Sequence, residues 1–147
     1  MSLSQQTAKH FRDVHFGGNW TSVNLKETLA DVSWQQAVTK IHNFNTIAAL
    51  VYHINYYVSV VLKVLQGEIL NASDKFSFGL PPIRSQDDWE NLLNKTWNDA
   101  ANFATLLEQL PEKRFGKHLP MKSMVIITGI LPALLSIHII TWVRSSS

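Results

Sequence analysis

The sequence contains no cysteine, and this absence removes several classes of site at once. Without cysteine there is no disulfide framework and no thiolate zinc site, and catalysis by a thiol of the protein itself is excluded. A metal ion bound to this chain would therefore need histidine, aspartate, glutamate or water as ligands.

The chain also lacks a large excess of either positive or negative charge. The 13 basic and 11 acidic residues give a formal net charge of +2, and no basic run could follow a phosphate backbone, so nucleic-acid binding is not expected. The first 12 residues lack the apolar stretch of a secretion signal, which predicts a cytoplasmic protein. Spacing typical of a nucleophile elbow, a catalytic triad, a glycine-rich phosphate loop, HxxxH or ExxH is missing as well.

What the chain has is helical periodicity. Its 147 residues, 46% of them hydrophobic, suit a single domain over residues 1–147 with one core. We expect a first helix over residues 2–16, ended by Gly17 and Gly18, and a short helix over 23–29. A capping box formed by Ser33 and Gln36 predicts a further helix start.

Two longer helices carry the strongest patterns. Apolar residues recur at helical spacing over residues 46–66, with Asn45 as the expected cap. A third long helix is expected over 86–110, capped by Ser85 and stopped by Pro111. Pro81 and Pro82 lie between the two and predict an ordered, non-helical crossover over 69–84.

The C-terminal segment, residues 121–147, differs from the rest. Residues 124–143 carry no charge and are about long enough to cross a hydrocarbon layer, so a tail anchor is one interpretation. Gly129, Pro132 and His138 interrupt the run, however, and the other helices need a fourth to close their core. We therefore favour a buried helix, and the predicted fold is all-α: an antiparallel four-helix bundle with a long crossover.

His53 is the candidate metal ligand. It lies on the flank of the apolar stripe of the 46–66 helix, beside Leu50, Ile54 and Tyr57. An imidazole in a bundle groove can ligate a metal through one nitrogen while the other is held by a hydrogen bond. A lone histidine there is more commonly a hydrogen-bonded groove residue, because a metal site needs about three protein ligands. We expect solvated side chains for the four histidines at positions 10, 15, 42 and 118.

The chain resembles the DinB-like family of DNA-damage-inducible four-helix-bundle proteins. The resemblance is carried by FGGNWTSVNLKETLADVSWQQA at residues 16–37, NTIAALVYHINYYVSVVLKVLQGE at 45–68 and DDWENLL at 87–93. It implies that the 46–66 helix is the family's second helix, whose histidine is the first metal ligand, and it gives that role to His53.

The fourth helix departs from the family pattern. Members usually end in a segment of the form YxRNIxGIIxHxYYHLGQI, in which two histidines four residues apart supply the other ligands. This chain has MKSMVIITGILPALLSIHIITWVRSSS from residue 121 onward, so the expected pair is missing. Only His138 could take the place of that pair. We consider it a poor substitute because its register differs from that of both family histidines and because Pro132 disturbs the helix before it.

A frameshift would explain the departure. From Pro120 onward, the same codons read from their third base permit the whole family signature in one unbroken frame. Three residues of that frame are forced whichever synonymous codons are used: a glutamate across Met121/Lys122 and glycines across Met124/Val125 and Trp142/Val143. We therefore hypothesise a frameshift upstream of about Met121, in the gene or in the recorded sequence.

The resemblance also implies a function. A mononuclear divalent metal, zinc or nickel, would bind imidazoles and activate water or a thiol, for hydrolysis or low-molecular-weight thiol transfer. From the fold itself we expect a homodimer formed by helix packing. In the printed sequence the site would be impaired. The alternatives are a non-catalytic dimeric bundle with a binding or stress-response role, and a tail-anchored membrane protein.

Overall fold

The computed structural model describes residues 2–18, 24–69, 71, 73–111 and 113, and these are helical without any strand. The helices are α1 (Leu3–Phe16), α2 (Leu25–Ala30), α3 (Trp34–Val38), α4 (Ile47–Leu65), α5 (Asp74–Ser77) and α6 (Gln86–Glu108). The predicted all-α class is thereby confirmed.

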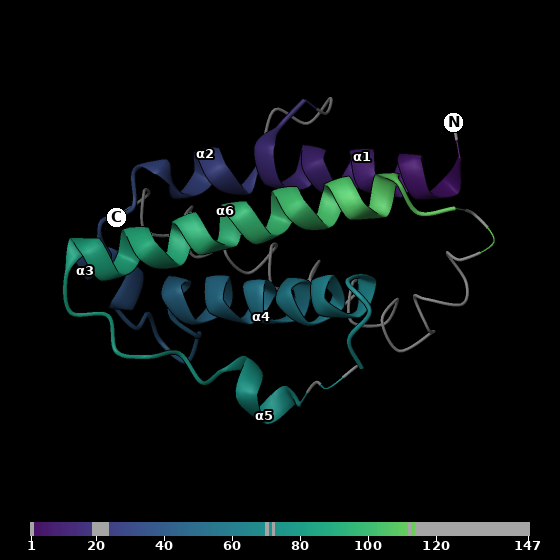
Figure 1. Ribbon diagram of the computed structural model, residues 1–147. Coiled ribbons are helices and arrows are strands. Elements are labelled where there is room, and N and C mark those ends of the chain that lie inside the picture. Colours follow the sequence, from purple (N-terminus) through teal and green to yellow (C-terminus); the bar gives the residue numbers. More distant parts are fainter. Residues whose placement is uncertain (1, 19–23, 70, 72, 112, 114–147) are drawn as a thin grey trace.

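The long helix α6 lies between α1 and α4 and packs against both (Figure 1). The contacts show that α1 is antiparallel to α6, because Ser4 at the start of α1 bonds the Leu110 carbonyl while Phe16 at its end meets Trp97. By contrast, α4 and α6 run in the same direction (Figure 1). That parallel pair is what a long crossover produces, since the chain must return to its starting end before α6 begins.

Side-chain caps set most of the helix starts. Ser2 and Ser33 form capping boxes, and Asn24 and Ser85 accept hydrogen bonds from backbone amides of the turns they precede. These satisfy amide groups that have no partner within the helix. The prediction that Asn45 caps α4 is wrong by one position. The Thr46 side chain accepts a hydrogen bond from the Ala49 amide, and α4 begins at Ile47.

The core lies along the inner faces of the three long helices. The apolar stripe that helical spacing predicts on α4 is buried except at its last member, Leu65, which is half-buried; its buried members are Ile47, Leu50, Val51, Ile54, Val58, Val61 and Leu62. On α6 the predicted inner face is buried at Trp89, Ala100, Phe103 and Leu107, and its other members, Leu92, Leu93 and Trp97, are half-buried. Phe11 of α1 meets Phe103 with ring centroids 4.7 Å apart, an edge-tilted packing of the kind aromatic pairs favour. This aromatic contact joins α1 to the α4–α6 pair.

The crossover between α4 and α6 contains a helix that the sequence did not predict. Pro81 and Pro82 are outside any helix, as expected, but α5 forms ahead of them at Asp74–Ser77. It lies at the lower edge of the molecule in Figure 1 and packs against α4. A single helical turn gives almost no periodic signal, which is why the pattern missed it.

The C-terminal segment, with its expected fourth helix, Pro132 and His138, lies outside the described residues. Among those the structure describes, α4 alone is long and apolar enough to span a membrane by length and composition. Its apolar window has a mean hydropathy of 1.4 and is 56% buried inside the protein. Core helices of soluble proteins meet the same criteria, so α4 gives little support to a membrane location.

His15 corrects one expectation: it is buried rather than solvated. Its side chain is 1% exposed, and its ring packs on Phe11 with centroids 4.2 Å apart. Nδ1 donates to the Phe11 carbonyl oxygen at 3.1 Å, because that oxygen can only accept. Nε2 is buried and has no hydrogen-bond partner in the structure as described. Burial disfavours the charged ring and lowers the pKa of His15 to about 4.

Stability should therefore fall in acid through His15. Because its folded-state pKa lies below the unfolded value of 6.5, the unfolded chain binds the proton first. The stabilisation is complete above about pH 6.5 and is lost as the pH falls toward 4, by roughly 3 kcal/mol in total. Denaturant unfolding of wild type and His15→Phe across this pH range measures it. The substitution should flatten the profile, whereas His10→Gln, on the exposed face of α1, should not; equal slopes for all three proteins would refute this role of His15.

Candidate functional site

His53 lies at the junction of α4 with the crossover, where three side chains hold its ring. Its Nδ1 atom and the Ser77 Oγ are 3.0 Å apart and share a hydrogen bond. Phe78 stacks on the ring, with centroids 4.4 Å apart and planes inclined by 16°. Tyr57, one helical turn along α4, meets it edge-on at 4.9 Å. The crossover thus fixes the orientation of the one side chain predicted to be a ligand.

The surroundings of His53 differ in exposure. Ser77 is completely buried, His53 is half-buried, and the Phe78 side chain is 46% exposed. A buried hydroxyl at Nδ1 sets ring orientation in the way that outer partners orient metal-bound histidines. The same contacts also suit a purely structural imidazole in an aromatic cluster.

The structure does not bring a second predicted ligand to His53. Among residues 2–18, 24–69, 71, 73–111 and 113, no group of three or more histidine, aspartate or glutamate side chains could hold a metal. His10 and His42 are exposed, as expected. His118 and His138 fall outside those residues. So do the positions Ser136/Ile137 and Ile140/Thr141, across which the shifted frame permits its two histidine codons. The completeness of a metal site therefore depends on the C-terminal segment.

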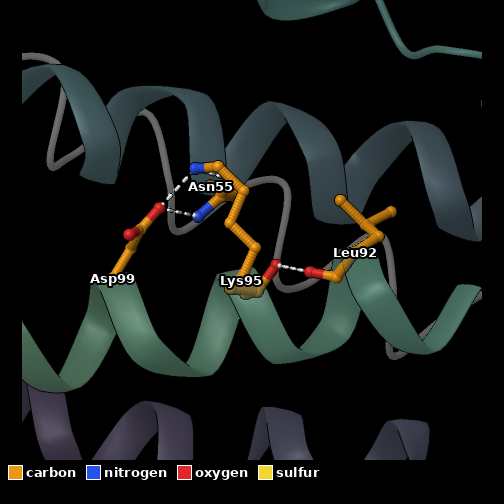
Figure 2. Close-up of polar contacts among 5 residues, drawn as sticks. Asn55, Leu92, Lys95 and Asp99 are labelled. Atoms are coloured by element: carbon orange, nitrogen blue, oxygen red, sulfur yellow. Dashed lines mark hydrogen bonds and ion pairs between the residues drawn. The ribbon is translucent and has the colours of Figure 1, made fainter. Parts of the chain in front are cut away.

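A polar cluster joins α4 to α6 elsewhere in the bundle (Figure 2). Asn55 is 3% exposed and donates through Nδ2 to Asp99 Oδ2 at 3.0 Å. Lys95 donates to the Asn55 Oδ1 at 3.2 Å and forms an ion pair of 2.5 Å with Asp99. All side-chain polar atoms of Asn55 are thus engaged on one face, so its burial is compensated. Removal of a partner would leave a buried amide unsatisfied, at a cost of about 1–3 kcal/mol.

Sequence reasoning missed Asn55, although a signal was present. The residue lies on the same face of α4 as Val51 and Val58, which are both buried. A polar residue in an apolar stripe must find a hydrogen-bonding partner on the neighbouring helix. Ser77 and Phe78 carried no such signal, because their positions around His53 depend on how the crossover folds.

Comparison with known proteins adds no relative. No protein-family model, no curated protein and no solved structure matches this chain.

Proposed function

We propose that this chain is a DinB-like four-helix-bundle protein in which His53 is a ligand position for a divalent metal, zinc or nickel. The complete site would serve hydrolysis or low-molecular-weight thiol transfer, since a bound metal lowers the pKa of water or a thiol and so generates a nucleophile. In the printed sequence the site is impaired, because the histidine pair of the family's fourth helix is replaced.

The observation that carries the proposal is the fixed imidazole of His53. Ser77 at Nδ1, Phe78 on the ring face and Tyr57 at its edge restrict the ring to one orientation. Pre-oriented ligands are typical of metal sites, because ordering the side chain beforehand lowers the cost of binding. His53 is also half-buried as a residue rather than enclosed in the core.

The arrangement of the helices supports the bundle. Among the long helices described, α6 packs against both α1 and α4. In a four-helix bundle each helix likewise packs against two neighbours. A fourth corner, between α1 and α4, would be supplied by the C-terminal segment.

The metal proposal predicts weak, His53-dependent binding by the printed chain. One imidazole supplies about a third of the usual ligand set, so zinc should bind more weakly than roughly 1 μM. Competition titration with a zinc indicator measures the affinity of wild type, His53→Ala and the matched control His10→Ala. The His53 substitution should weaken binding at least several-fold, and the control should not.

Two outcomes would contradict this account. If His53→Ala binds zinc as wild type does, His53 is not a ligand. If the printed chain holds one zinc per chain tightly, its site is not impaired, and His138→Ala would then identify the second ligand.

A second candidate function, a non-catalytic dimeric bundle, is favoured by the surface of the crossover. Ile69, Phe76 and Phe78 are 90%, 62% and 46% exposed. Exposed apolar side chains mark protein interaction sites where they form a contiguous surface, and all three of these residues belong to the crossover. We call these three residues the crossover patch and propose it as the interface of a homodimer, in which a second copy would also cover the outer face of the His53 cluster.

The dimer is tested by sedimentation equilibrium. Wild type should sediment at twice the chain mass of 16.7 kDa, and Phe76→Lys should shift the equilibrium toward monomer because it places a charge in the interface. Leu3→Lys is the matched control, since Leu3 is 55% exposed on α1, away from the crossover. A monomeric wild type, or equal effects of the two substitutions, would contradict the proposed interface.

A further inference from the structure

A surface groove separate from the His53 cluster lies between the crossover and α6. It has a volume of about 370 Å³, within the size range of small-molecule sites. Its apolar walls are residues 80–83 of the crossover and Leu92 of α6. The polar groups at its rim are Tyr52 of α4 and Asp88, Asn91 and Lys95 of α6. An apolar trough with a few polar groups fits a small amphipathic molecule.

The charges at the rim are not equivalent. Lys95 is compensated within the protein, because its ammonium contacts Asp99 and Asn55 (Figure 2). Asp88 accepts a hydrogen bond from the Arg84 backbone amide, and among the described residues no cation lies within ion-pair distance of it. Arg84 itself does not line the groove. The charge that remains available to a ligand is therefore the negative charge of Asp88.

The helix end does not reverse this sign. Asp88 lies in the first turn of α6, where the helix dipole places about half a positive charge. Asp87 shares that turn, so two carboxylates exceed the partial charge of the helix end. Tyr52 adds an aromatic side chain, whose ring face attracts cations.

We propose that this groove binds small organic ammonium compounds with an apolar body. The ammonium group would pair with the Asp88 carboxylate, and the apolar body would lie along Leu92 and residues 80–83. Asn91, which is exposed at the rim, offers a further hydrogen bond. The site depends on neither the metal nor the C-terminal segment.

Calorimetric titration with 2-phenylethylamine tests the proposal, with 3-phenylpropionate as the probe of opposite charge. The amine should bind saturably and the carboxylate at least about fivefold more weakly, as expected for one partly exposed charge pair. Asp88→Asn should weaken amine binding by a similar factor; its side-chain oxygen can still accept from the Arg84 amide, so the turn is retained. Asp87→Asn removes the same charge outside the groove and should have a smaller effect.

Chemical-shift mapping of the amine complex locates the site independently. The largest changes should fall on Tyr52, Leu92 and residues 80–83, and Asn91→Trp should reduce binding by filling the groove from its exposed rim. Any of three results would overturn the proposal: no saturable binding of the amine, equal binding of the carboxylate, or equal losses in the Asp87 and Asp88 variants. Circular dichroism of each variant shows whether the fold is retained.

Discussion

The packing of α6 against both α1 and α4 is the interaction on which the rest of the described structure depends. On one side Phe103 meets Phe11, and the Arg12 guanidinium pairs with Glu108 at 2.7 Å. On the other side Asn55 bonds Asp99 across the α4–α6 interface. Apolar burial supplies most of the favourable free energy, whereas the buried amide adds specificity because it finds its partners in only one register.

The parallel pairing of α4 and α6 also determines where chemistry can occur. A parallel pair requires a crossover along the outside of the bundle, and this crossover carries Ser77 and Phe78 to His53. The same segment forms one wall of the groove at Asp88 and bears the crossover patch. The three proposed sites for metal, ammonium ligand and second copy therefore share one connecting segment.

Much of the fold could be predicted from the sequence, for physical reasons that differ among elements. Repeating apolar positions identified α4 and α6, because helix burial imposes its period on the sequence. Ser33 and Ser85 marked helix starts through a local hydrogen bond. His15 was misassigned because its burial depends on α1 packing against the rest of the bundle, and α5 was missed because one turn has no period. For the candidate site, His53 was found from its position on the flank of an apolar stripe and from the family resemblance, while its Ser77 and Phe78 contacts required tertiary structure.

Native-state hydrogen exchange tests the central role of α6 most directly. If α6 holds both neighbours, its backbone amides between Thr96 and Phe103, flanked by buried side chains on both sides, should exchange only on global unfolding. Those of the single-turn α5 should exchange through local opening at much lower free energy. Protection factors in the middle of α6 as low as those of α5, while α1 and α4 remain protected, would contradict the account.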